Sequence, residues 1–407
     1  MICSTPKPTP IRSRKTSKPL SNWAVGPDQM HEVEITRRFQ HRALKDGCKL
    51  SFIGAGAYHH HIPAPVSLQS SPFAMIPGRG TAASQASELM QSLSGLNAMS
   101  ATHFAGADLI SAMVKGIEII QKTLKRARTN RILIASTVNP FYRKAIKTRL
   151  KFLGIDLEII RYDEDTGAVG MDYLSKIDKK SADALIVQHP NFFGVVEDVD
   201  EISNWAFSQG IPLMAIVNPL ALGAVKAAGK WGKRGAEMAI YDLQTLGLPT
   251  CLSGSIAAFI SMKQRLINKI TPADKSALVA LEKQQADNWM ITRANAYLNY
   301  QAESGLTRVA QQCARNLLQI EDSLLENPLL SVRFSGNRFH ESVFEFDRVN
   351  LPAVLSLCAG DGLQIGYPLE SEYPELCRCL LLNATEVHLP EDIGAMVAKL
   401  NKNIELQ

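Results

Sequence analysis

The sequence lacks a long hydrophobic run. Hydrophobic residues make up 46% of the 407 residues, yet no stretch approaches the roughly 18 consecutive apolar residues that a membrane-spanning helix needs. Charged residues make up 20%, close to the usual globular balance, which excludes global disorder and fibrous folds. At roughly 150 residues per domain, we expect a soluble protein of two or three domains with no membrane partner.

Cysteine is scarce and shows no pairing pattern. The seven cysteines are an odd number scattered over a long chain, which argues against a disulfide framework and for a reducing compartment. Only Cys377 and Cys379 lie close together, and on a strand that spacing would put both thiols on one face, as a metal or redox pair requires. Because no second Cys or His pair stands at ligand spacing, we favour a structural role and expect a cytoplasmic protein.

Acidic residues are absent from residues 1–27, which hold five basic residues and five prolines. These cations account for the whole formal net charge of +5, so the remainder is neutral and offers no wide cationic face to nucleic acid. The prolines prevent helix and strand, including the amphipathic helix of a transit peptide. We interpret residues 1–27 as a disordered basic tail.

From residue 28 the pattern becomes regular, beginning with a helix over residues 28–47. The predicted strands are 131–136, 157–162, 184–188, 212–217, 237–241 and 256–260, and the predicted helices among them are 109–123, 140–153 and 202–208. This alternation specifies an α/β fold with a parallel sheet covered by helices on both faces. Beyond residue 272, helices at 275–300, 305–326 and 391–401 and strands at 330–334, 341–346 and 380–382 predict a smaller α+β unit.

Two short motifs near residue 55 are weak signals. Gly54 and Gly56 give only half of a dinucleotide-binding pattern, and prolines follow where a helix should begin, so a tight turn is favoured. In the run of three histidines, His59 and His61 share a face of an extended segment. No acid or cysteine nearby completes a tetrahedral set, so we predict no metal site and interpret the run as an active-site-facing loop.

Four longer stretches support an identification. Residues 51–63 (SFIGAGAYHHHIP), 187–198 (VQHPNFFGVVED), 217–226 (VNPLALGAVK) and 242–249 (DLQTLGLP) closely resemble, in order and spacing, the first subunit of the two-subunit glycine dehydrogenase (decarboxylating), the P-protein of the glycine cleavage system. Residues 334–336, 373–376 and 384–386 also resemble that family, so the resemblance runs from about residue 28 to residue 400.

The resemblance implies a fold-type I, pyridoxal-phosphate-dependent transferase-like architecture. A large domain with a mainly parallel sheet would be followed by a small C-terminal α+β domain. We place an N-terminal helix and active-site-facing loop at 28–72, the large α/β domain at 73–300 and the small domain at 301–407. The helix and strand pattern suggests the same architecture independently.

The resemblance also identifies two missing groups. An enzyme of this fold that holds its own cofactor needs an Asp at one strand end, to pair with the pyridine nitrogen, and a Lys after the next strand, to form the Schiff base. Asn218 stands at the Asp position and Gln244 at the Lys position. Because an amide forms no imine and an uncharged Asn stabilises no pyridinium, we predict that this chain has no catalytic residue and binds no cofactor covalently.

The family resemblance implies that a partner supplies what is missing. In this family the second subunit carries the Lys and pyridoxal phosphate, and the pair decarboxylates glycine and passes the aminomethyl group to the lipoyl arm of the carrier H-protein. Tyr58, His60 and Pro63 match a family loop and are expected at the subunit interface near the partner's cofactor. The alternative is a packed loop with a half-buried tyrosine.

A second candidate segment follows the predicted strand 184–188. His189 and Asn191 lie where a parallel strand ends, and ligands of open α/β sheets bind outside such ends. We therefore predict that both residues line the partner's site or the interface. The alternative is a turn in which Phe192 and Phe193 simply cover the sheet.

Two segments depart from the family pattern and leave the function open. Residues 74–81 keep a proline but lose aromatic and acidic residues. Residues 270–289 are shorter and far less basic than the family segment, which removes cationic groups that could meet a phosphate or carboxylate. The chain is then either a partner subunit of a working enzyme or a degenerate, non-catalytic scaffold or regulator. An independent enzyme using Lys226, Lys230 or Lys233 is disfavoured, because none stands at the strand-to-turn position.

Overall fold

The computed structural model describes residues 50–52, 100–106, 108–247, 258–273 and 289–407. The predicted tail, the N-terminal helix and the loop that holds Tyr58, His60 and Pro63 lie outside these residues. None of the helices in the described ranges is long and apolar enough to cross a membrane.

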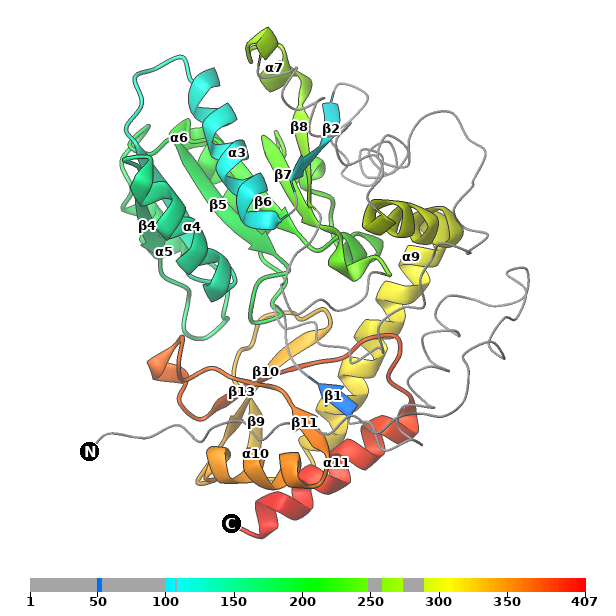
Figure 1. The fold of residues 1–407 in the computed structure, drawn as a ribbon. Coiled ribbons are helices and arrows are strands. Elements are labelled where there is room, and N and C mark those ends of the chain that lie inside the picture. The colour runs from blue at the N-terminus through cyan, green and yellow to red at the C-terminus, as the bar shows by residue number, and fades with distance from the viewer. Residues whose placement is uncertain (1–49, 53–99, 107, 248–257, 274–288) are drawn as a thin grey trace.

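A seven-stranded sheet forms the centre of the larger unit (Figure 1). Its strands are β2 (Ser100–Gly106), β3 (Arg131–Ala135), β4 (Asp156–Ile160), β5 (Ala184–His189), β6 (Leu213–Val217), β7 (Met238–Asp242) and β8 (Ala258–Lys263). The order across the sheet is β2-β8-β7-β6-β5-β3-β4, in which β4, β3, β5, β6 and β7 run parallel and β8 is antiparallel to both neighbours. The predicted α/β fold with a mainly parallel sheet is confirmed.

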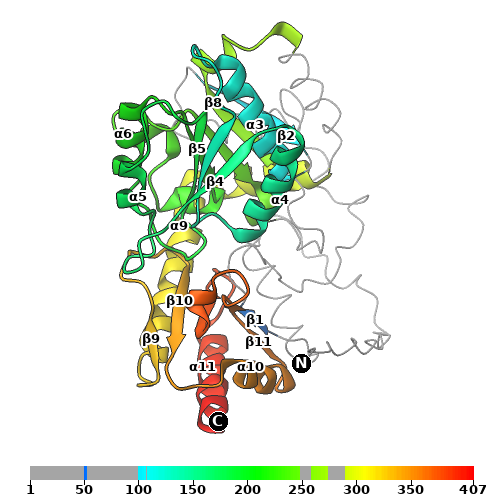
Figure 2. The same cartoon turned by 90° about the vertical axis from the view of Figure 1, so that its left-hand side faces the viewer.

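Helices cover both faces of this sheet (Figure 2). Helices α3 (Leu109–Thr123) and α4 (Pro140–Phe152) lie on one face, and α5 (Met171–Ser175) and α6 (Val199–Gln209) on the other. Asp108 begins α3 by accepting a hydrogen bond from the backbone N–H of Ser111 at 2.7 Å. Gly116 brings α3 close to the strands, since a Cβ there would lie 2.7 Å from the Met238 sulfur.

The smaller unit packs a four-stranded antiparallel sheet against helices. Its strands follow the order β12-β13-β10-β9: β12 (Tyr367–Pro368), β13 (Cys379–Asn383), β10 (Glu341–Phe346) and β9 (Leu330–Val332). Helices α10 (Leu351–Gly360) and α11 (Pro390–Glu405) share its core, and β11 (Leu363–Ile365) pairs in parallel with β1 (Leu50–Phe52). This is the α+β unit that the sequence predicted.

One long helix replaces the second of the two predicted helices and the end of the first. Helix α9 runs without interruption from Trp289 to Leu324, so the predicted break before Gly305 was wrong. Gly305 lies inside this helix, and a Cβ there would stand 2.4 Å from the oxygen at the end of the flexible Gln301 side chain. The first part of α9 packs in the core of the large sheet and its last turns pack in the smaller unit, so the predicted domain boundary at 301 stays a prediction.

Cys377 and Cys379 do not lie on one face of a strand. Cys377 is exposed at the end of a short 3₁₀ turn, whereas Cys379 begins β13 and is buried. In the part of the chain that the structure describes, no cluster of three or more His, Cys, Asp or Glu side chains could hold a metal. The structural interpretation of the two cysteines stays a prediction.

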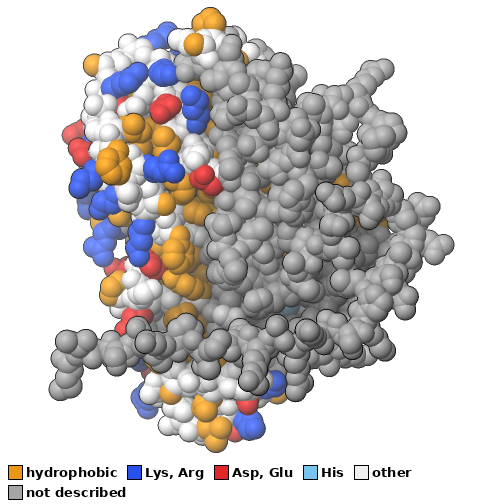
Figure 3. Space-filling view, in the orientation of Figure 1, with side chains coloured by type: hydrophobic (Ala, Val, Ile, Leu, Met, Phe, Trp, Pro, Cys, Tyr) orange, Lys and Arg blue, Asp and Glu red, His pale blue; other side chains and the backbone are white. Residues whose placement is uncertain are grey.

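The visible described surface mixes charges with apolar side chains (Figure 3). Helix α4 contributes five basic side chains and no acidic one, and it ends in Phe152, which is 86% exposed. Lys144 from this helix pairs with Glu372 at 2.7 Å, so part of the basic surface is neutralised by the smaller unit.

Candidate functional site

Three neighbouring parallel strands end at one edge of the large sheet. His189 at the end of β5 pairs in register with Val217 at the end of β6, which pairs in turn with Tyr241 on β7. Asn218 and Asp242 therefore come next to each other at the carboxyl edge, the place where open α/β sheets bind ligands. The structure thus brings together the strand ends that the sequence singled out.

Asn218 and Gln244 both begin or join short 3₁₀ turns at this edge. The Asn218 side-chain oxygen accepts a hydrogen bond from the backbone N–H of Leu220 at 3.0 Å and so starts the turn Pro219–Gly223. Gln244 lies in the turn Leu243–Thr245, where its backbone N–H donates to the Asp242 carboxylate at 3.0 Å. Both turns are capped by side chains of the kind that favour such starts.

Tyr142 adds a group that the sequence did not identify. Its hydroxyl lies 3.4 Å from the Asp242 carboxylate, and it projects from the first turn of α4. Burial raises the pKa of the Tyr142 hydroxyl, and the negative charge of Asp242 raises it further. The edge therefore carries a carboxylate and a neutral phenol beside the amide residues. A Tyr two residues after the Asn139-Pro140 helix start was the available signal.

The Asn191 side chain is fully hydrogen-bonded, to its own loop and to the segment before α5. Its side-chain NH₂ donates to the Gly167 carbonyl at 2.8 Å and to the Glu197 carboxylate at 2.7 Å, while its oxygen accepts from Phe193 and Val195 N–H groups. The residue is buried and all four hydrogen-bonding positions of its amide are used. Its geometry is that of a residue that holds the loop in shape.

The two phenylalanines of this loop cover the sheet end. Phe192 and Phe193 are buried with Tyr373, Tyr162 and Phe334 in a cluster that joins the large sheet to the smaller unit. The Phe193 and Phe334 rings lie 4.8 Å apart between centroids, within the usual range for aromatic pairs. The alternative interpretation of this segment, a packed aromatic turn, describes Phe192 and Phe193.

Glu197 is a buried acid that the sequence did not single out. Its carboxylate accepts hydrogen bonds from the Thr137 hydroxyl at 3.1 Å, the Asn191 amide at 2.7 Å and the Val169 N–H at 2.8 Å. Burial raises the pKa of Glu197 to about 7, although the three hydrogen bonds act in the opposite direction. The acid preceding the helix-starting Asp198 was the only sequence signal.

His189 projects to the other side of the sheet from Asp242. The neighbouring Gln188 accepts a hydrogen bond from the backbone N–H of Asn139 at the start of α4, so it faces the α4 side. Side chains alternate along a strand, and His189 accordingly faces α6, where its ring meets Trp231 edge-on at 5.4 Å between centroids. The structure therefore does not bring His189 together with Tyr142 and Asp242.

Comparisons with known proteins place this geometry in a class and then in a family. The architecture is that of fold-type I pyridoxal-phosphate enzymes: a crystal structure of glycine decarboxylase (P-protein) of the glycine cleavage system matches with a TM-score of 0.70 at 20% identity, covering 96% of this chain and 92% of that one. Alanine–glyoxylate aminotransferase from Nostoc sp. matches with a TM-score of 0.58 at 14% identity, over 79% and 86% of the two chains.

The sequence matches are more specific than the fold. The family model of the glycine cleavage system P-protein matches residues 6–288. A probable glycine dehydrogenase (decarboxylating) subunit 1 from Nitrosomonas europaea is 32% identical over 90% of this chain and 87% of its own length, and one from Nitrosospira multiformis is 32% identical over 93% and 90%. The chain belongs to the glycine cleavage system P-protein family.

The strand-end residues do not fit a covalently held pyridoxal phosphate. Gln244 has no amine that could form an imine, and Asn218 uses its side-chain oxygen to start a turn and carries no charge for a pyridinium. Asp242, the carboxylate present at this edge, is turned toward Tyr142 and the Gln244 backbone.

Proposed function

We propose that the chain is the non-cofactor-binding subunit of a glycine dehydrogenase (decarboxylating). In this assignment a second P-protein subunit supplies the lysine and pyridoxal phosphate, and the pair decarboxylates glycine and transfers the aminomethyl group to the lipoyl carrier H-protein. The observation that supports it best is the likeness to subunit 1 proteins over nine-tenths of the chain, combined with amides at positions 218 and 244.

This chain's contribution would be to complete the partner's site. Tyr58, His60 and Pro63 lie outside the described residues, and their place near the partner's cofactor stays a prediction from the family loop. For His189 and Asn191 the geometry favours a supporting role, because the hydrogen-bonding groups of Asn191 are all used within this chain and His189 faces α6. We place the complex in the cytoplasm.

Coexpression with the second subunit tests the proposal. Each subunit alone and the copurified pair would be assayed for exchange of labelled bicarbonate into the glycine carboxyl group, with pyridoxal phosphate and H-protein supplied. We expect exchange only from the pair. Exchange by the second subunit alone at the same rate contradicts the proposal, and a stable pair without exchange identifies the chain as a non-catalytic scaffold.

A further inference from the structure

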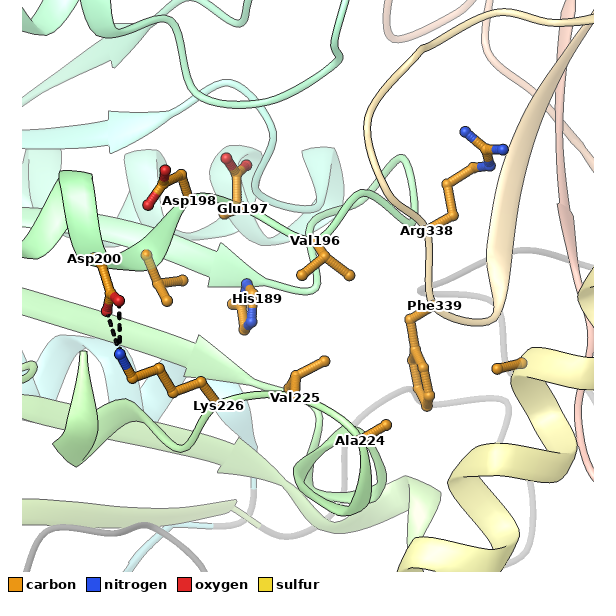
Figure 4. Close-up of a pocket in the computed structure, with 12 residues that line it drawn as sticks. His189, Val196, Glu197, Asp198, Asp200, Ala224, Val225, Lys226, Arg338 and Phe339 are labelled. Atoms are coloured by element: carbon orange, nitrogen blue, oxygen red, sulfur yellow. Dashed lines mark hydrogen bonds and ion pairs between the residues drawn. The ribbon is translucent and has the colours of Figure 1, made fainter. Parts of the chain in front are cut away.

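A pocket of about 440 Å³ lies at the end of β5, on the α6 side of the sheet (Figure 4). It is bounded by the end of β5, the start of α6, the segment 224–226, helix α9 and the loop before β10. Because His189 faces this side and Asp242 faces the α4 side, the pocket lies across the sheet from the Tyr142–Asp242 pair.

The inner polar group of the pocket is the imidazole of His189. The ring is 1% exposed, and neither ring nitrogen has a hydrogen-bond partner among the described residues. Burial lowers its pKa to about 4, so at neutral pH the ring is uncharged, with one nitrogen donating and the other accepting. Buried polar groups are normally satisfied, which indicates that a molecule with both a donor and an acceptor belongs here.

The outer polar group is an ion pair. The Lys226 ammonium contacts both carboxylate oxygens of Asp200, at 2.6 and 2.7 Å, and both side chains are about half exposed, at 43% and 48%. Exposed ion pairs are weak and open readily. Asp200 is also held by the Gly232 N–H, which donates to its carboxylate at 2.6 Å. The pair therefore presents a fixed negative group and a lysine able to turn to a bound molecule, side by side at the mouth.

The other charged residues around the pocket are committed elsewhere. Glu197 points away from it and is held by three hydrogen bonds (Figure 4). Arg338 also points away, bonded to Glu321 at 2.7 Å and to the carbonyl oxygens of Phe334 and Gly336. Asp198 also borders the pocket, and its carboxylate starts α6 by accepting a hydrogen bond from the Glu201 N–H at 3.0 Å. The other lining residues are apolar: Val196, Val199, Ala224, Val225, Ala314 and Phe339.

These groups define the chemistry of a ligand. An α-amino acid carries an ammonium and a carboxylate side by side, the opposite arrangement to the Asp200–Lys226 pair. Its side chain would then extend between the apolar walls toward His189, where a hydroxyl or an amide both donates and accepts. We propose that this pocket binds a free α-amino acid whose side chain carries a hydroxyl or amide group, a site beyond the proposed subunit function.

Calorimetry on the full chain tests this proposal with L-serine, L-threonine, L-asparagine and L-glutamine. For L-threonine, three analogues each remove one group: α-aminobutyrate lacks the hydroxyl, β-hydroxybutyrate lacks the ammonium and threoninol lacks the carboxylate. We expect saturable binding of at least one amino acid at one site per chain. For threonine each analogue should bind about tenfold more weakly or worse, as the loss of one good polar contact predicts.

Two lysine variants locate the binding. Lys226→Met should weaken binding about tenfold, whereas Lys233→Met, an exposed lysine of the same segment outside the pocket lining, should leave it unchanged. His189→Leu should abolish the preference for threonine over α-aminobutyrate. Should that variant not fold, NMR of the His189 ring in the unmodified chain gives the same information, because a bound hydroxyl shifts the ring signals.

Three outcomes overturn the proposal. If none of the four amino acids binds saturably, water and not an amino acid is the hydrogen-bond partner of the His189 imidazole. Binding that Lys226→Met leaves intact would place the ligand elsewhere, and glycine binding as tightly as the larger amino acids would remove the role of His189. All of these are measured on the chain alone, so they stand or fall independently of the exchange assay.

Discussion

The backbone of Gly194 lies directly against the carbonyl group of Glu341. A Cβ on Gly194 would stand 2.0 Å from that oxygen, and Gly194 has a positive φ of 81°. Beside this contact, the Phe339 N–H donates to the Gly194 carbonyl at 3.1 Å and the Val196 N–H donates to that of Asn337 at 2.7 Å. The loop after β5 is thus joined to the chain entering β10, which brings Phe339 to the pocket.

Gly194→Ala should destabilise the protein by about 3 kcal/mol or more, because the methyl group has no space and the φ is strained for an L-residue. Thermal unfolding measures the effect. Gly154→Ala is the matched control, since Gly154 also has a positive φ, of 66°, but nothing lies within 4 Å of its Cβ position. Equal losses for the two variants would show that the contact with Glu341 is unimportant.

Glu197 should make stability fall as pH rises. Its folded pKa of about 7 lies above the ordinary 4.5, so the folded state favours the protonated carboxyl. That stabilisation is complete below pH 4.5 and lost by pH 7; a shift of this size corresponds to about 3 kcal/mol. Denaturation of wild type and Glu197→Gln should be measured at several pH values. The free energy of unfolding of the Gln variant should rise relative to that of wild type as pH increases from 4.5 to 7. A constant difference would contradict it.

The buried histidines His189 and His340 should make stability fall as pH falls, the opposite of the effect of Glu197. Burial lowers the pKa values of His189 and His340 from 6.5 to about 4, so the unfolded chain binds more protons between these values. Their contribution is complete above pH 6.5 and lost as pH falls toward 4. His340→Phe should therefore reduce the acid sensitivity of unfolding, and an unchanged acid limb of the pH profile would count against this assignment.

The main effect of Asn191→Ala should be a loss of folding stability and not a direct loss of catalysis. It removes four hydrogen bonds and leaves the Phe193 and Val195 N–H groups without their acceptor, which corresponds to roughly 2–4 kcal/mol. Thermal unfolding with Asn337→Ala, an exposed amide nearby, as the control measures the loss. An Asn191→Ala protein of unaltered stability but slower exchange in the complex would instead restore the site role first predicted for this residue.

The purified chain should carry no covalent pyridoxal phosphate. Gln244→Lys should yield at most a weak adduct that borohydride reduces, because Asn218 still leaves the pyridine nitrogen without a charged partner. Only the double variant with Asn218→Asp should show amino-acid turnover. Absorbance and mass spectrometry after reduction test this, and a stoichiometric adduct on the unmodified chain would overturn the placement of Gln244 at the lysine position.

The sequence predicted elements well where local signals agree. The helix 109–123 and the strand 341–346 have the predicted ends, because an N-cap or a clear apolar pattern marks them. Helix α10 was missed since its residues are apolar almost all round and give little periodicity. The antiparallel direction of β8 could not be predicted from the sequence, because a buried strand has the same apolar pattern whether it runs parallel or antiparallel to its neighbours.

The candidate site was predictable at the level of strand ends and not of side-chain directions. Asn218 and Gln244 lie in short turns directly after β6 and β7, and their match to the family's aspartate and lysine positions stays a prediction. His189 and Asn191 lie two residues apart in the sequence, yet one faces a pocket and the other is locked in its loop. The contacts that decide this, from Glu197, Trp231 and Gly167, come from segments that no local pattern connects.

Because α9 runs without interruption from the larger unit into the smaller one, it limits where the chain can be divided into soluble fragments. Leu306, Val309 and Cys313 complete the core of the large sheet, whereas Leu317 and Ile320 belong to the smaller unit. A fragment that stops at residue 300 would lack the first three and expose apolar surface on the large unit. The two halves should therefore be recovered as separate soluble fragments only if the N-terminal piece extends through residue 313.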